Sequence, residues 1–179
     1  IFALKSPKKA KADMGTVMVG PLLTTTWDQC APYNMFCPEE CPAGCYPVAL
    51  AQLMNYWKWP KESMGKIRKE DGDIDFSGHV YDWDNMVDRY DCYYYKNEEG
   101  YQEEVVTYNY EQAVAVARLM ADIGKAFGTD YTPEASRTPF IYEPLVTNFG
   151  YNLDDEYGIE LHRDSLASGL LDVMRTELD

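Results

Sequence analysis

A cysteine at the boundary between a proline-rich loop and a well-patterned helix constrains the fold of this chain more than any other sequence feature. Residues 31–45 contain three prolines and therefore predict an irregular loop. Apolar residues then recur at helical spacing; they are Ala49, Leu50, Leu53, Met54 and Trp57. Pro47 is compatible with a helix here, because a missing N–H in the first turn costs no hydrogen bond. We therefore expect a helix that begins at Cys45, ends before Pro60 and presents a thiol at its N-terminus.

Two of the three roles open to Cys45 are structural. A lone free cysteine is most often a buried core residue. Cys37, Cys41 and Cys45 are also spaced by four, as in a zinc site or a disulfide framework. The distant residues that would complete a zinc site form no paired motif; they are Cys92, His79 and His162. The chain has five cysteines, an odd count, so at least one thiol is unpaired if the chain stands alone.

The third role for Cys45 is that of a nucleophile. A helix N-terminus carries about half a positive charge and unpaired N–H groups, which stabilise a thiolate over a thiol. Gly44 lets the backbone approach the helix start closely and leaves the sulfur uncrowded on that side. Upstream, Gln29 supplies a side-chain amide that is suited, together with the Cys45 N–H, to hold a tetrahedral oxyanion. This role also requires a general base.

Composition narrows the class of protein. Hydrophobic residues make up 46% of the chain, which is typical of a globular protein and excludes a disordered one. The formal net charge is −14, and such a surface repels phosphate backbones, so we expect no nucleic-acid partner. No apolar run approaches the roughly 20 residues that a membrane span needs. Residues 1–17 begin with a basic, acid-poor stretch that we interpret as a linker or processing region preceding a domain at 18–179.

Two further helices are expected. The first runs from Asn109 to Gly124, with Gln112 completing a capping box at its start. Its inward-facing residues are Ala113, Val116, Ala117 and Met120. The second begins near Ser165 and continues to Asp179 without the usual stop signals.

The remaining segments predict strands and loops. Strands are expected near residues 18–28 and 149–163, whereas residues 61–79 and the tyrosine-rich stretch 91–104 predict exposed loops. Pro139 predicts the start of a short helix, which Pro144 would break or kink.

A series of motifs runs through the chain from residue 21 to about residue 152. They are "PLLTTTWDQCAPYN", "CP", "GCYPVALAQLMNYWKWP", "YDWDNM", "LMADIG", "DYTPEAS" and "NFGYN". In this order they closely resemble the streptopain family of bacterial papain-like cysteine peptidases, which includes interpain-like enzymes. The likeness extends well beyond the residues around the cysteine, and it is therefore highly specific.

The resemblance implies a papain-like α+β fold. This chain would form mainly the helical left subdomain, with the β-rich right subdomain largely absent. Residue by residue, the resemblance implies that Cys45 is the catalytic nucleophile and Gln29 the oxyanion donor. It further suggests that Gly44, Tyr131 and Ser136 contact the substrate, and it implies neither a metal nor another cofactor.

Two features depart from the family pattern. Tyr46 and Pro47 alter the first turn after the nucleophile, where the family has Val and Ala. The preceding loop carries Cys30, Cys37 and Cys41, which the family does not require. Two of these thiols would be able to form a disulfide beside the site, and the sequence leaves their pairing open.

The general base is the element missing from the sequence. In the family it is a histidine on a strand of the right subdomain, at a position that falls beyond Asp179. His79 and His162 are interpreted as exposed or partly buried surface residues. We therefore expect a C-terminal chain or segment of the same precursor to supply the catalytic histidine.

The sequence thus favours a cysteine endopeptidase that hydrolyses protein substrates through a Cys–His mechanism. The resemblance implies a bacterial virulence enzyme, secreted or located at the cell surface or in the periplasm, and made as a zymogen with residues 1–17 as a prosegment tail. One alternative is a non-catalytic secreted binding protein on the same scaffold, and another is a cysteine-rich zinc or disulfide module. The presence of Gln29, Gly44 and Cys45 together favours the enzyme.

Overall fold

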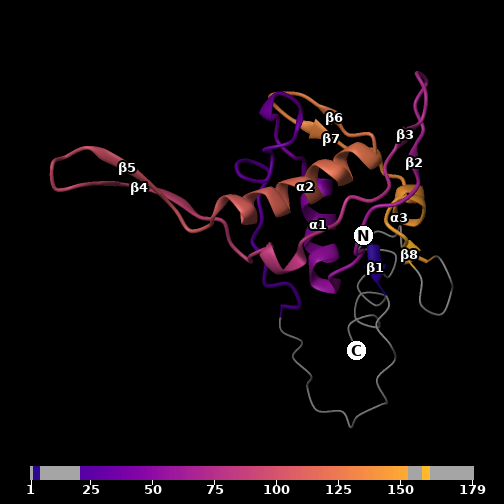
Figure 1. The fold of residues 1–179 in the computed structure, drawn as a ribbon, viewed down its shortest axis with the longest axis horizontal. Helices are drawn as coiled ribbons and strands as arrows, with labels where there is room; N and C mark the ends of the chain where they lie inside the picture. The colour runs from indigo at the N-terminus through magenta and orange to yellow at the C-terminus, as the bar shows by residue number, and fades with distance from the viewer. Residues whose placement is uncertain (1, 5–20, 153–158, 162–179) are drawn as a thin grey trace, which may run out of the picture. The chain divides into compact units, whose positions relative to one another are not determined.

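The computed structural model describes residues 2–4, 21–152 and 159–161 (Figure 1). Its helices are α1 (Cys45–Trp57), α2 (Tyr110–Ala126) and α3 (Glu143–Thr147), with 3₁₀ turns η1 (Pro38–Glu40) and η2 (Trp83–Asn85). Its strands are β1 (Phe2–Leu4), β2 (Lys66–Ile67), β3 (Ile74–Asp75), β4 (Cys92–Lys96), β5 (Gln102–Val106), β6 (Asp130–Tyr131), β7 (Ser136–Arg137) and β8 (Ile159–Leu161). The strands pair as four antiparallel ladders, β1–β8, β2–β3, β4–β5 and β6–β7. Within the described ranges, no helix has the length and apolar character to span a bilayer.

The chain divides into two compact units, Leu23–Phe149 and the combination of Ile1–Leu22 with Gly150–Asp179. In the second unit, β1 pairs with β8 so that Phe2 lies opposite Leu161. The strand expected near 149–163 is therefore present in part, as β8. β1 lies in a segment interpreted as a linker. Residues 5–17, His162 and the helix expected from Ser165 fall outside the described residues, so the domain boundary stays a prediction.

The core of the Leu23–Phe149 unit forms where α1 packs against α2. Of the five α1 residues expected at helical spacing on one face, Leu50 and Met54 are buried and Leu53 is half-buried, whereas Ala49 and Trp57 are exposed. The four inward residues expected of the second helix are buried to 2% exposure or less; they are Ala113, Val116, Ala117 and Met120. The apolar spacing thus predicts both helices, and it gives the buried face of α2 correctly but that of α1 only in part.

The start of α2 is confirmed and its end differs from the prediction. The Asn109 side chain accepts from the Gln112 N–H at 2.8 Å, and the Gln112 side chain accepts from the Asn109 N–H at 2.9 Å. The helix continues past Gly124 to Ala126, and Gly128, with φ of 67°, follows it. Gly124 serves packing rather than termination, because its missing side chain leaves room for the hydroxyl of Tyr131.

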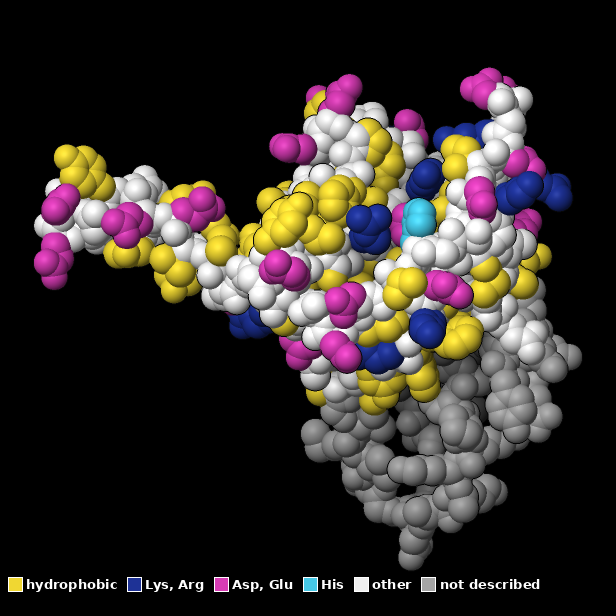
Figure 2. Space-filling model, viewed as in Figure 1, with side chains coloured by type: hydrophobic (Ala, Val, Ile, Leu, Met, Phe, Trp, Pro, Cys, Tyr) yellow, Lys and Arg dark blue, Asp and Glu magenta, His cyan; other side chains and the backbone are white. Residues whose placement is uncertain are grey.

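The tyrosine-rich stretch is exposed as expected, but it is a β-hairpin rather than a loop. β4 and β5 pair over five residues each and project away from α1 and α2 as a narrow arm (Figure 1). The side chain of Asn97 closes the turn by accepting from the backbone N–H groups of Glu99 and Tyr101. Hydrophobic and acidic side chains are interspersed along the arm (Figure 2). Aromatic residues favour strands, and this preference decides the local structure here.

Two other local predictions are wrong. Residues 21–28 join no strand ladder; their placement comes from contacts with α1 and with the segment before β4. No helix begins at Pro139. The short helix α3 begins at Glu143 instead, with Pro144 in its first turn, where the missing N–H removes no helical hydrogen bond.

Candidate active site

Cys45 is the first residue of α1, and it is exposed. Gly44 immediately before it has φ of 97°, a conformation that L side chains rarely adopt. A Cβ at this position would lie only 3.3 Å from the Pro47 Cδ and 3.3 Å from the Ser136 Cβ. The backbone conformation therefore favours glycine strongly, and any side chain would in addition make two tight contacts. It turns the chain into the helix so that the Cys45 thiol stands at the N-terminal end, among backbone N–H groups that have no helical partner.

Gln29 is held at the same end of α1. The backbone carbonyl of Gln29 accepts a hydrogen bond of 2.8 Å from the N–H of Ala43, two residues before the cysteine. The Gln29 N–H donates to the side chain of Asp28, and the Gln29 side chain itself is half-buried. This backbone link holds residue 29 beside the segment that leads into α1.

A residue of α1 that the sequence analysis did not single out positions the segment leading to Gln29. The Gln52 side-chain oxygen accepts from the Thr25 hydroxyl at 2.9 Å and from the Trp27 N–H at 3.4 Å. Trp27 is buried, and its indole N–H donates to the carbonyl of Val87 at 2.9 Å. Gln52 lies seven residues after Cys45, which is two helical turns, so the same face of α1 carries both. The spacing places Gln52 on the face of Cys45, but no local pattern indicates its partners Thr25 and Trp27.

The β6–β7 hairpin closes the other side of the loop before Cys45. The Ser136 hydroxyl donates to the carbonyl of Pro42, 94 residues earlier in the chain. Ser136 therefore lies beside the predicted site and packs directly against Gly44. The structure brings together four of the five residues singled out in the sequence, namely Gln29, Gly44, Cys45 and Ser136.

Tyr131 points elsewhere. Its hydroxyl lies against Gly124 of α2, beside the Cys37 thiol. Burial raises the pKa of the Tyr131 hydroxyl, which therefore stays protonated at any working pH. Tyr131 supports the loop before the nucleophile through Cys37. Its direct contact with a substrate stays a prediction.

The tight contact between Gly124 and Tyr131 yields a stability prediction. A Cβ at Gly124 would lie 1.8 Å from the Tyr131 hydroxyl oxygen, so Gly124→Ala must displace that side chain. We expect a loss of about 1–3 kcal/mol in the free energy of unfolding, as for other overpacked cores. The measurement is urea denaturation of the purified chain.

A second substitution distinguishes a steric clash with Tyr131 from a general destabilisation of α2. Removing the hydroxyl with Tyr131→Phe in the Gly124→Ala background should restore part of the lost stability. Ala121→Ser is the control, because it tests how well α2 tolerates a small substitution on the same helix. Gly72→Ala is unsuitable as a control, because Gly72 has a φ of 120°. Wild-type stability of Gly124→Ala would contradict the packing assigned to Tyr131.

Tyr46, which departs from the family pattern, anchors the loop that follows β7. Its ring packs against Phe127 and Phe140, with centroids 5.1 Å and 6.0 Å apart. Its hydroxyl donates to the Ile141 carbonyl at 3.4 Å. The side chain after the nucleophile is thus turned inward, and the altered first turn leaves the Cys45 thiol exposed.

All five cysteines are free thiols in this structure. Burial raises the pKa of Cys37, and the neighbouring Cys41 raises it further. Cys92 lies on the arm, where a 3.0 Å hydrogen bond to the Glu104 carboxylate raises its pKa. In the part of the chain that is described, no three His, Cys, Asp or Glu side chains gather as a metal site would require.

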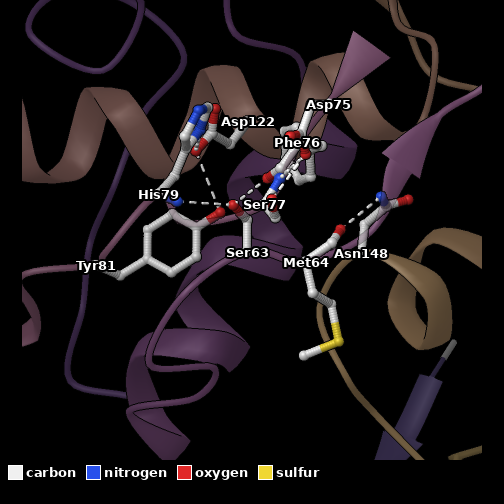
Figure 3. Close-up of polar contacts among 9 residues, drawn as sticks. All are labelled: Ser63, Met64, Asp75, Phe76, Ser77, His79, Tyr81, Asp122 and Asn148. Atoms are coloured by element: carbon white, nitrogen blue, oxygen red, sulfur yellow. Dashed lines mark hydrogen bonds and ion pairs between the residues drawn. The ribbon is translucent and has the colours of Figure 1, made fainter. Parts of the chain in front are cut away.

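His79 is engaged by Asp122 and Ser63 (Figure 3). Its Nδ1 lies 2.9 Å from the carboxylate of Asp122, which also accepts from the Tyr81 hydroxyl at 3.2 Å. The backbone N–H of His79 donates to the hydroxyl of Ser63, a fully buried residue. His79 is half-buried, in agreement with its interpretation as a partly buried surface residue. Its partners belong to the α2 core and not to the N-terminus of α1.

Comparisons with known proteins identify relatives of this arrangement. The sequence model of the Peptidase C10 family matches residues 27–179. Streptopain of Streptococcus pyogenes is 23% identical over 154 residues, which cover 70% of this chain and 35% of that protein. The chain therefore spans about a third of the length of the curated relatives it matches.

Two solved structures are similar to the chain. Active wild-type interpain A, a cysteine protease of Prevotella intermedia, is 33% identical with a TM-score of 0.56, covering 72% of this chain and 54% of that one. A fragment of prointerpain A from the same organism is 32% identical with a TM-score of 0.57, covering 72% and 42%. Both likenesses include most of this chain and about half of the longer proteins.

Proposed function

Because the chain belongs to the peptidase C10 family and has a papain-like α+β fold, we propose that it is the nucleophile-bearing part of a cysteine peptidase. The observation that carries the proposal is the exposed Cys45 thiol at the first residue of α1, beside a glutamine segment fixed to the same end. A cysteine with a structural role is normally buried. Cys45 is instead exposed at a helix N-terminus, and it follows a glycine of positive φ.

In the proposed mechanism, a histidine base takes the proton of Cys45 to give a thiolate–imidazolium pair. The thiolate attacks the carbonyl carbon of a peptide bond, and the Gln29 amide and the Cys45 N–H hold the oxyanion. The imidazolium then protonates the leaving amine as the C–N bond breaks. Water, deprotonated by the same histidine, hydrolyses the thioester and restores the thiol.

The histidine is proposed to come from another segment of the same precursor. His79 is bound to Asp122 and packs on Phe76, with ring centroids 5.4 Å apart, so it is committed to another part of the unit. His162 lies outside the described residues. We also propose that the chain is made as a zymogen, because one of the similar solved structures is that of a proenzyme fragment, prointerpain A.

Peptide and protein substrates are proposed to bind in extended form across the N-terminus of α1. The Cys45 thiol is exposed, and Ser136 packs against the neighbouring Gly44 from the β6–β7 hairpin. Tyr131 contributes by holding this hairpin against α2. A secreted or cell-surface location in a bacterium is part of the proposal, and it rests on the family relation alone.

Selective alkylation of Cys45 tests the proposed nucleophile. At mildly acidic pH, iodoacetamide should modify Cys45 first, because reaction requires an exposed thiolate. Cys37 and Cys41 are buried, and Glu104 disfavours the thiolate of Cys92. Cys30 is the matched control, since it is exposed but precedes no helix. Time-resolved peptide mapping by mass spectrometry gives the order of modification.

Equal modification of Cys30 and Cys45 would contradict the activation of Cys45 by its position. The same mapping with a peptidyl chloromethylketone separates a peptidase from a binding protein on the same scaffold. A peptidase that has its histidine present should couple this reagent to Cys45 alone. A binding protein should react no faster than a denatured control.

A further inference from the structure

The Leu23–Phe149 unit contains a second concave feature, a cavity of about 890 Å³ to which α2 contributes one wall. The β2–β3 hairpin and the segments around Phe36 and Ile141 provide the others. Cys45 and Gln29 are not among its lining residues. Its volume falls within the range of natural ligand sites, roughly 300–1,000 Å³. We call this feature the basic groove, after its four cationic residues Arg68, Lys69, Arg118 and Lys125.

The charge of the basic groove is opposite to that of the rest of the chain. The groove holds four of the 16 Lys and Arg residues but only one of the 30 Asp and Glu residues. Figure 2 shows blue side chains around a hollow beside the histidine. All four cationic side chains are exposed, and among the described residues none forms an ion pair. On a chain of net charge −14, such a cluster attracts anionic groups locally.

The single acidic residue of the groove is already engaged. Asp122 is buried, and its carboxylate lies 2.9 Å from His79 Nδ1 and accepts from the Tyr81 hydroxyl (Figure 3). Asp122 is buried beneath these partners, whereas the four cationic side chains are exposed. An anion that approaches the groove therefore meets the cations first.

The basic groove also exposes apolar surface. Phe36 is 42% exposed and Ile141 is 37% exposed, although both are large hydrophobic residues. The Arg118 guanidinium carbon lies 5.3 Å from the centroid of the Phe36 ring, which fixes one cation above an apolar face. A small inorganic anion would use the charges alone and leave this surface in water. A peptide that carries acidic and aliphatic side chains would use both.

We propose that the basic groove binds an extended peptide segment in which acidic side chains flank an aliphatic pair, at a place distinct from the Cys45 site. The acidic side chains would pair with Lys69 and Arg68 on the hairpin and with Lys125 and Arg118 on α2. The aliphatic side chains would cover Phe36 and Ile141. This binding does not depend on the proposed peptidase activity.

Fluorescence anisotropy with a labelled peptide tests the proposal. The probe is fluorescein-Glu-Asp-Leu-Leu-Asp-Glu, and the protein is the full chain with Cys45→Ala, so that no cleavage consumes the probe. Its uncharged isostere, Gln-Asn-Leu-Leu-Asn-Gln, should bind at least about tenfold more weakly, because several ion pairs are lost together. Replacing the two leucines by glycine should also weaken binding by about tenfold or more. Raising NaCl from 50 to 500 mM should reduce the affinity for the acidic probe.

Two matched double variants assign the binding to the groove. Lys69→Glu with Lys125→Glu reverses one charge on each wall, whereas Lys61→Glu with Lys96→Glu makes the same change in net charge outside the groove. The first pair should lower affinity by about tenfold or more, and the second by less than about threefold. Thermal melts of both variants verify folding.

Equal weakening by the two double variants would overturn the proposal, since binding would then follow net charge alone. Tripolyphosphate is added as a competitor at a concentration that supplies as many negative charges as the peptide. If it displaces all of the bound peptide, the groove binds anions in general, and the proposal of a peptide ligand is overturned. No binding of the acidic probe at 50 mM NaCl would overturn the site itself. None of these results depends on whether Cys45 is a nucleophile. A failure of the binding proposal would therefore leave the proposed peptidase function untouched, and the reverse also holds.

Discussion

Cys45→Ala should abolish peptide hydrolysis by the proposed enzyme, in which this chain is combined with the segment proposed to supply the histidine. We expect kcat to fall on the order of 10⁵-fold or more, because no other group can form the covalent acyl intermediate. Cys45 is exposed at the first position of α1, and alanine is favourable in a helix. The free energy of unfolding should therefore change by no more than about 0.5 kcal/mol.

The measurement is hydrolysis of a fluorogenic peptide by wild type and variant at matched concentration. Cys30→Ala is the control, because it removes another exposed thiol from the loop that precedes α1. It should leave kcat within about twofold, as expected of a surface substitution. Residual hydrolysis by Cys45→Ala at the level of Cys30→Ala would remove Cys45 from the mechanism.

The two long helices were predictable because their signals are local. The apolar spacing after Cys45 and the Asn109–Gln112 pair each lie within a few residues of the structure they specify. Both predictions are confirmed at the helix starts. The end of α2 was missed because Gly124 suits a helix end and a tight packing contact equally well, and only the distant Tyr131 decides between them.

Segments with weak local signals were the ones predicted wrongly. The arm formed by β4 and β5 has many polar and charged residues, which resemble a loop, but three consecutive tyrosines favour an extended chain. Pro144 was expected to break or kink a helix that starts at Pro139, but it lies in the first turn of α3, where a proline costs no hydrogen bond. In both cases the residue types were compatible with two structures, and their position within the element decided.

The residues of the candidate site likewise fall into those that a local pattern predicts and those that depend on distant contacts. Gly44 and Cys45 are adjacent in sequence, so their relation follows from the chain itself. The contribution of Ser136 depends on a hydrogen bond to Pro42 across 94 residues, and the sequence suggested it only through the family resemblance. The role of Gln52 depends on the path of residues 25–27 beside α1, which no local pattern encodes.

Gln29→Ala should lower kcat by roughly 100- to 1,000-fold while changing KM little. The amide is proposed to contact the oxyanion only as it forms, so its loss raises the barrier by about 2.7–4 kcal/mol without weakening substrate binding. Folding should be preserved, because Gln29 is linked to Ala43 through its backbone carbonyl, which the variant retains. Steady-state kinetics on a fluorogenic peptide gives the two constants.

Alkylation separates a role in the transition state from a role in placing the thiol. Iodoacetamide reacts with the Cys45 thiolate without forming an oxyanion, so Gln29→Ala should be modified at nearly the wild-type rate even though it hydrolyses peptides poorly. Gln52→Ala is the informative comparison, because it releases the Thr25 and Trp27 contacts but retains the Gln29 amide. It should reduce kcat less than Gln29→Ala and also lower the free energy of unfolding, by about 1 kcal/mol for the lost hydrogen bonds. A Gln29→Ala variant that loses alkylation and hydrolysis in equal proportion would show that Gln29 positions Cys45 rather than stabilising the oxyanion.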